Sequence, residues 1–205
     1  FGLGTFNTVA HGTFTSYQQN EGVDNVNGIF LNAPELAGGY GIYTLFDGAG
    51  TFVDNGGGNA DFTFTSASFN LYIDPNQDTT KTLPGSAPGA VALGNIVDDY
   101  LVGSASMLSA GSGQLVAGIG GFFDLVFDDF ALTSPDGTSY FISPSPFNYN
   151  MVNVDGDFDT IALVGNQTTT GDFSAVFVPE PGSLALLGIG LTGLGALARR
   201  RRKSA

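Results

Sequence analysis

The chain has 205 residues, 19 of them acidic and only six basic, and a formal net charge of −13 at pH 7. Five of the six cations are consecutive near the end of the chain, so residues 1–178 hold 18 acidic side chains against one basic side chain, a net charge of −17. Such a body repels nucleic acid and anionic lipid, and the absence of cysteine excludes disulfides and thiol chemistry. This charge asymmetry indicates that the two parts of the chain face different surroundings.

The first third of the chain has the composition and the alternation of β-strands. Turn-forming residues separate short runs of aromatic and β-branched residues. Strands are predicted at residues 41–46 and 61–74, and a weaker pattern covers residues 12–17. Within 61–74 the apolar phase changes around residues 66–68, which predicts a β-bulge or a strand that passes between two environments. The glycine-rich stretch 47–60 is expected to be a loop.

The middle of the chain is less regular. Residues 83–90 predict a loop. Residues 93–101 place apolar side chains at helical spacing, but Gly94 and several β-branched residues oppose a stable helix, so the segment is ambiguous and we favour a strand. A further strand is expected at residues 114–118.

A strand within residues 121–133 has an apolar face and a wetter face. The first carries Phe123, Leu125 and Phe127, and the second carries Asp124, Val126 and Asp128. The turn signal at 133–137 then allows residues 138–142 to return as its hairpin partner.

The remaining pattern completes an all-β domain. Residues 143–149 contain two prolines and predict a loop, and strands are expected at 160–164 and 174–178. Short strands with frequent turns over residues 1–178 predict one antiparallel β-sandwich or jelly roll, which is long enough to bury a sizeable core.

Residues that carry catalysis are scarce. His11 is the only histidine, so a zinc site would need carboxylates around one imidazole, which is unusual. A Ser-His-Asp arrangement could form only through His11, and no G-x-S-x-G stretch is present. The glycines at 118–121 are followed by neither the helix of a dinucleotide-binding loop nor the lysine of a phosphate-binding loop. We therefore interpret the protein as a non-enzyme and His11 as a surface or partly buried residue.

Two groups of polar oxygens are candidates for a calcium ion, the one cofactor that these patterns allow. Asp74, Asn76 and Asp78 resemble the opening of a calcium loop, but the glycine and glutamate that complete an EF-hand are absent. The other group is Asp155, Asp157 and Asp159, which alternate and would share one face of a strand. The alternatives are a polar hairpin for the first group and a solvated face for the second.

The C-terminal region has the pattern of a membrane span. Residues 182–198 carry no charge and only two polar side chains, and as a helix they would be roughly 25 Å long. That is the lower limit for crossing a bilayer, and glycines are tolerated there. We predict a single transmembrane helix over 182–198, with a buried soluble helix as the alternative. The positive-inside rule places Arg199, Arg200, Arg201, Arg202 and Lys203 in the cytoplasm and the acidic body on the other side.

Immediately before this span the chain contains the motif Pro179-Glu180-Pro181. A motif of this kind, an apolar helix and a terminal arginine cluster together resemble the PEP-CTERM sorting signal of Gram-negative bacteria. The resemblance divides the chain into an exported domain (1–178) and a sorting signal (179–205) whose basic tail is 199–205. It implies export, transient anchoring in the inner membrane and processing near the motif by an exosortase. The mature protein would then lie at the cell surface or in the extracellular matrix.

The physical properties of the motif and of the first residues agree with export. The two prolines prevent a helix and keep an extended segment just outside the bilayer, where a protease can bind it as a strand. The chain starts at Phe1 without methionine or a basic region, so we expect a secretory signal peptide to precede it.

Three stretches of the body carry a second resemblance. Residues 98–105 (DDYLVGSA), 118–127 (GIGGFFDLVF) and 152–159 (VNVDGDFD) resemble the flocculation-associated PEP-CTERM proteins of floc-forming bacteria. This resemblance implies a non-catalytic role in holding cells together in an exopolysaccharide matrix, and it carries no catalytic residues. The alternative is a carbohydrate-binding β-sandwich module, although tryptophan, a common sugar-stacking residue, is absent. A secreted hydrolase is the third hypothesis.

Overall fold

The computed structural model describes residues 2–19, 24–26, 31–32, 38–85, 89–141 and 149–179, and it confirms the all-β prediction. Among these residues the single helix is α1 (Asp136–Tyr140). The strands are β1 (Gly2–Phe14), β2 (Tyr17–Gln19), β3 (Asp24–Val26), β4 (Gly41–Gly56), β5 (Asn59–Asp74), β6 (Thr80–Thr82), β7 (Ala92–Gly94), β8 (Tyr100–Ala105), β9 (Leu108–Val116), β10 (Gly120–Phe127), β11 (Ala131–Leu132), β12 (Tyr149–Phe158) and β13 (Phe173–Pro179).

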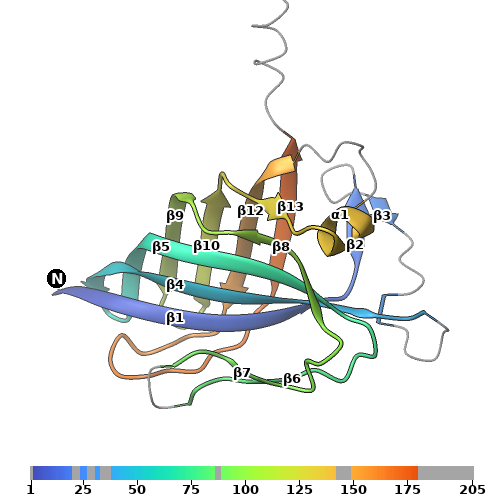
Figure 1. Ribbon diagram of the computed structural model, residues 1–205. Helices are drawn as coiled ribbons and strands as arrows, with labels where there is room; N and C mark the ends of the chain where they lie inside the picture. The colour runs from blue at the N-terminus through green and yellow to red at the C-terminus, as the bar shows by residue number, and fades with distance from the viewer. Residues whose placement is uncertain are drawn as a thin grey trace, which may run out of the picture.

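Nine strands form one curled antiparallel sheet, in place of the two facing sheets expected of a sandwich or jelly roll (Figure 1). The strand order is β1-β4-β5-β9-β10-β12-β13, while β8 pairs with β5 and β11 pairs with β8. The branch is possible because β5 is 16 residues long. Along the same side of β5, residues 60–63 pair with β9 and residues 69–73 pair with β8. The pairs β2–β3 and β6–β7 form two small separate sheets.

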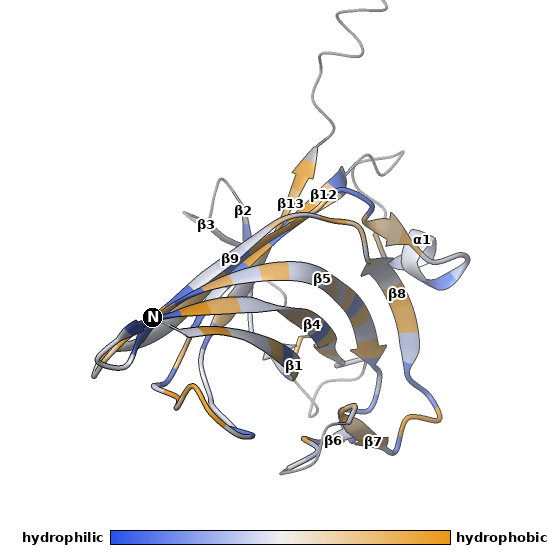
Figure 2. Ribbon diagram, turned by 90° about the vertical axis from the view of Figure 1, so that its left-hand side faces the viewer, coloured by the Kyte–Doolittle hydropathy of each residue, from blue (hydrophilic) through white to orange (hydrophobic). Residues whose placement is uncertain are grey.

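The curl brings the two edge strands of the sheet together. β1 and β13 are not hydrogen-bonded neighbours, yet the ring centroids of Phe14 and Phe173 lie 4.9 Å apart. A Cβ at Gly12 would lie 1.9 Å from a ring carbon of Phe173, so glycine is needed for this close approach. Figure 2 shows β1, β4 and β5 as nested arcs that enclose a concave side.

The predicted loop at 47–60 is wrong, because β4 and β5 extend through it as a long hairpin. Only Gly57 and Gly58 remain between the strands, with φ values of 66° and 84°. Positive φ at both central positions is what a two-residue hairpin turn of the favoured type requires. Inside the strands, glycine serves a different purpose, because a Cβ at Gly50 would lie 2.1 Å from a backbone oxygen and 2.8 Å from the Phe6 ring.

The predicted change of phase in 61–74 is confirmed as a bulge. The β4–β5 register shifts between Ala49 and Gly50, which face Ser66 and Phe64, so that Thr65 is the extra residue. One extra residue reverses the alternation. As a result, the apolar residues on both sides of the bulge stay on the concave face of the sheet, where Phe64 and Phe69 line the same cavity.

The predicted hairpin partner at 138–142 is wrong, because residues 136–140 form α1 and Ile142 lies outside the described residues. The Thr133 side chain accepts a hydrogen bond from the Gly137 N–H at 3.3 Å, and the Thr133 carbonyl accepts one from the Thr138 N–H at 3.1 Å. Gly137 also packs against the Val102 backbone, where a Cβ would clash. The turn signal therefore starts a helical turn that packs on β8, and β12 takes the place of the returning strand beside β10.

The other predicted strands have mixed outcomes. Residues 41–46, 114–116 and 174–178 lie in β4, β9 and β13, and the ambiguous stretch 93–101 begins and ends in strands β7 and β8. Residues 160–164 form no strand, which corrects that prediction. They belong to the long connection between β12 and β13.

The core lies on the concave face, where strands from distant parts of the chain meet. Phe69 of β5, Leu125 and Phe127 of β10 and Val152 of β12 have no exposed surface. Phe69 and Phe127 pack with ring centroids 6.4 Å apart. The predicted apolar face of 121–133 is thus confirmed.

Truncating a core ring should destabilise the fold far more than truncating a surface ring. We expect Phe69→Ala to lower the free energy of unfolding by about 3–5 kcal/mol, through lost burial and a cavity. Phe122 is 53% exposed on the outer face of β10, so Phe122→Ala should change it by no more than about 0.5 kcal/mol. Urea unfolding of the full chain measures both, and equal effects would contradict this assignment of the core.

Candidate functional site

A large aromatic cavity lies on the concave side of the sheet. Its volume is about 430 Å³, within the range of small-molecule sites. Side chains from β1, β4, β5, β10, β12 and β13 converge on it, together with the connection between β12 and β13. Eight of the lining residues are phenylalanines: Phe6, Phe46, Phe62, Phe64, Phe69, Phe123, Phe158 and Phe173.

Edge-to-face contacts hold the rings of this cavity in place. The Phe6 ring on β1 lies 5.5 Å from Phe62 and 4.9 Å from Phe64, both on β5, and is nearly perpendicular to both. Phe62 in turn lies 6.4 Å from Phe158 on β12. Such arrangements favour the attraction between ring edges and ring faces. The packing therefore fixes the shape of the cavity before any ligand arrives.

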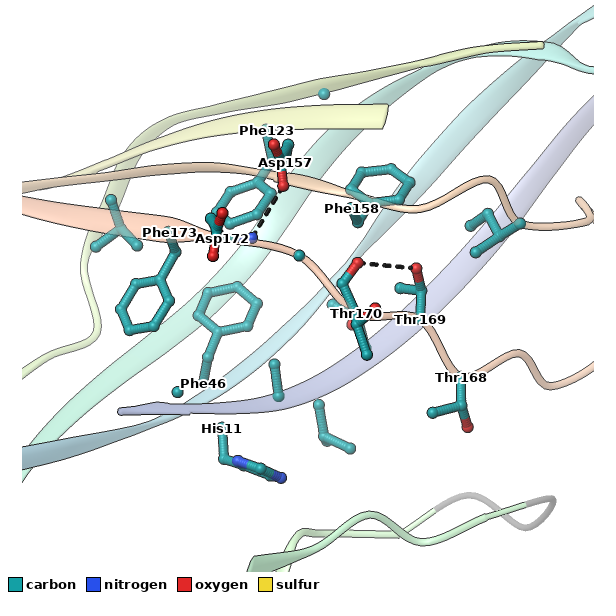
Figure 3. A pocket seen from close by; sticks show the side chains of 18 of the residues that line it. His11, Phe46, Phe123, Asp157, Phe158, Thr168, Thr169, Thr170, Asp172 and Phe173 are labelled. Atoms are coloured by element: carbon teal, nitrogen blue, oxygen red, sulfur yellow. Dashed lines mark hydrogen bonds between the residues drawn. The ribbon is translucent and has the colours of Figure 1, made fainter. Parts of the chain in front are cut away.

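The rim of the cavity is polar and acidic. The Asp172 N–H donates to Asp157 Oδ1 at 2.9 Å, and the Thr170 hydroxyl donates to Asp159 Oδ2 at 2.6 Å. Figure 3 shows Thr168, Thr169 and Thr170 in succession along the connection that leads to Asp172 and β13. Asp157 and Asp172 both line the cavity and are exposed.

His11 was expected to be a surface or partly buried residue, and its side chain is exposed. It lies on the opposite side of β1 from Phe46 (Figure 3). Desolvation, and then the nearby positive charge of Lys81, lower the pKa of the imidazole below its usual value. His11 is therefore neutral at pH 7 and adds no positive charge to the rim.

The three alternating aspartates each have a donor from the neighbouring segment. Asp155 accepts a hydrogen bond from the Ser174 hydroxyl, Asp157 from the Asp172 N–H, and Asp159 from the Thr170 hydroxyl. All three side chains are exposed. Through these hydrogen bonds the three aspartates help to attach β12 to the segment that leads into β13, and this role does not require an ion.

The loop at 74–78 is closed by its own hydrogen bonds. Asp74 is only 4% exposed, and its carboxylate accepts the N–H groups of Asp78 at 3.3 Å and Thr79 at 3.0 Å. Asn76 Oδ1 also accepts the Asp78 N–H, at 3.2 Å. Desolvation, followed by repulsion from Asp98, Asp74 and Asp99, raises the pKa of Asp78. Like charges therefore crowd around this loop.

Neither calcium assignment is tested by these contacts. Within the ranges that the structure describes, no three histidine, aspartate or glutamate side chains are grouped so as to hold a metal ion. Both assignments stay predictions, and the crowding around Asp78 favours the loop at 74–78.

The sorting motif follows the last strand directly. Pro179 is the final residue of β13 and pairs with Tyr149 of β12. Glu180, Pro181, the expected span at 182–198 and the basic residues 199–203 lie outside the described residues. Among the described residues, no helix has the length and apolar character to cross a membrane.

Comparison with known proteins identifies the C-terminal segment. Residues 177–203 match the PEP-CTERM protein-sorting motif. The chain therefore carries a PEP-CTERM sorting motif at residues 177–203, which implies export through the membrane and recognition by an exosortase. No curated protein and no solved structure shows significant similarity to the chain.

The aromatic cavity was missed by sequence reasoning. The signal that could have revealed it is the recurrence of phenylalanine on one phase of separate strands, at Phe6, at Phe62 and Phe64, and at Phe123. Without the strand order, nothing in the sequence shows that these positions face one another.

Calcium should stabilise the folded body at the loop of 74–78. A ligand that binds only the folded form stabilises it by about 2.7 kcal/mol at a hundredfold excess over its dissociation constant. We expect Ca²⁺ to raise the melting temperature of the full chain more than NaCl of equal ionic strength does. The excess should vanish in the Asp74→Asn, Asp78→Asn variant and persist in Asp47→Asn, a control on β4.

The competing site has its own variant. Loss of the calcium-specific shift in the Asp155→Asn, Asp157→Asn, Asp159→Asn variant, with the loop intact, would move the ion to that row. If Ca²⁺ has no more effect than NaCl, both assignments fail and the aspartates are solvated surface.

Proposed function

We propose that this exosortase-sorted protein acts at the cell surface or in the extracellular matrix, where it promotes flocculation and biofilm formation. The observation that carries the proposal is the sorting motif at 177–203 on a body with 18 acidic residues and one basic residue. The resemblance of 98–105, 118–127 and 152–159 to flocculation-associated proteins supports it. The function is non-catalytic, and the partners are the exosortase, the inner membrane during sorting, and extracellular polysaccharide.

The mechanism rests on charge. Lys81 is the one base of residues 1–178, and its single positive charge leaves the 18 acidic side chains largely uncompensated. Proteins of the same negative sign repel each other and repel acidic polymers. Divalent cations can bridge carboxylates on the protein to those on neighbouring chains or on acidic polysaccharide. Aggregation of this kind requires many copies held at the surface, which is what sorting supplies.

Sorting should depend on the three-residue motif. We expect the Pro179→Ala, Glu180→Ala, Pro181→Ala variant, or loss of the exosortase, to leave the full-length protein in the inner membrane. Mass spectrometry of the normal extracellular form should find no peptide that contains Arg199–Lys203. The Thr168→Ala variant, changed in the body, should be sorted normally. An intact basic tail on the released protein would contradict processing.

Cell aggregation should depend on the sorted protein and on divalent cations. We expect deletion of the gene to reduce floc size, and the unaltered gene to restore it. The gene with the three alanines at 179–181 should not restore it. A chelator should disperse the flocs of the complemented strain, and added Ca²⁺ should reform them. Normal flocs in the deletion strain would exclude the proposed function and leave the sorting result intact.

A further inference from the structure

The aromatic cavity offers a binding surface of a definite chemical kind. Most of its phenylalanines are only partly buried, including Phe6, Phe62, Phe64 and Phe158. Their ring faces and edges therefore remain available to a ligand. A preformed apolar pocket is poorly hydrated and binds apolar groups favourably. The body of the ligand should accordingly be a hydrocarbon chain or an aromatic system.

The electrostatics of the rim select the polar end of the ligand. Asp157 and Asp172 line the cavity and outnumber the one nearby ammonium, that of Lys81, which does not line it and lies 4.4 Å from the centre of the Tyr43 ring. His11 is neutral at pH 7 for the reasons given above. The rim thus repels a carboxylate, sulfate or phosphate group and attracts a positive one. Phenylalanine faces add a second attraction for cations.

Sugar hydroxyls fit this cavity poorly. A saccharide buried among eight phenylalanine rings would leave most of its hydroxyl groups without hydrogen bonds, which is costly. The polar lining residues are few for a cavity of this size: Thr8, His11, Thr44, Gln167–Thr170 and the two aspartates. The Thr44 hydroxyl is already used, because it donates to the Asn70 carbonyl at 2.8 Å. The cavity is therefore matched to a molecule with one polar end and one apolar end.

We propose that the cavity between β1, β5 and β12 binds a small amphiphile with an apolar body and a positively charged head group. The body lies among the phenylalanines, and the head lies at the rim beside Asp157 and Asp172. Binding of the amphiphile does not depend on cell aggregation or on whether the sorting segment is processed. It gives an otherwise acidic surface protein a means of capturing hydrophobic cations from its surroundings.

The proposal is tested by competition against a fluorescent apolar probe. The full chain, kept in solution by a non-ionic amphipathic polymer, is loaded with N-phenyl-1-naphthylamine, and the polymer alone provides the baseline. Three competitors share one alkyl chain: dodecyltrimethylammonium, dodecanol and dodecanoate. We expect all three to displace the probe, with the ammonium compound binding about threefold to tenfold more tightly than the carboxylate, as expected for exposed charges.

Matched variants locate the site. Ala10 lies on the inner face of β1 and lines the cavity, whereas Asn7 lies on the outer face of the same strand. Ala10→Phe should weaken binding by at least about tenfold, and Asn7→Phe should not. Thr8→Phe is a second blocking variant on the inner face. Melting curves identify any variant that fails to fold.

A charge pair of variants tests the head group. The double variant Asp157→Asn, Asp172→Asn should bind the three competitors with equal affinity. The control variant Asp47→Asn should keep the preference for the cation. Failure of all three competitors to displace the probe from the folded chain would overturn the proposal. So would equal binding by Ala10→Phe and Asn7→Phe, or a preference for the carboxylate.

Discussion

The β4–β5 hairpin is the element on which the rest of the structure depends. β4 supports the edge strand β1 along its full length, while the other side of β5 supports both β8 and β9. Two features permit this: a turn of two glycines with positive φ, and a bulge at Thr65 that keeps the phenylalanines of β5 on one face. Without the bulge, either Phe62 and Phe64 or Phe69 would face outward, and neither the core nor the cavity would be complete.

The sheet combines an aromatic interior with a strongly acidic exterior. Phe123 and Leu125 of β10 and Val154 of β12 point inward, whereas Asp124 and Asp155 point outward and lie directly opposite each other on paired strands. Like charges in that position are destabilising. The hydrogen bond that Asp155 accepts from Ser174 offsets part of this repulsion. Acidity at the surface is therefore maintained at a cost in stability, which is consistent with a role for the charge itself.

Predictions from the sequence were correct for features that depend on local alternation. They were wrong where a contact with a distant part of the chain determines the local structure. The alternation around Leu125 and the phase change near Ser66 were correct, because each reports which side of a strand is buried. Glycines at 47–60 indicated a loop, since only the neighbouring rings explain why Gly50 belongs in a strand. Residues 136–140 form a helix because Gly137 fits against the Val102 backbone, a contact 35 positions away in the chain. The cavity depends on six strands and could not be derived from any one of them.

The position of Pro179 has a mechanical consequence. β13 is the last strand in the order of the sheet, it pairs with β12, and it ends at the residue where the sorting motif begins. Any tension transmitted through the chain beyond residue 179 therefore enters the folded body at this strand and loads the β12–β13 ladder before any other. Because β13 also packs on β1 through the Phe14 and Phe173 rings, pulling this strand away would open the curled sheet at its seam.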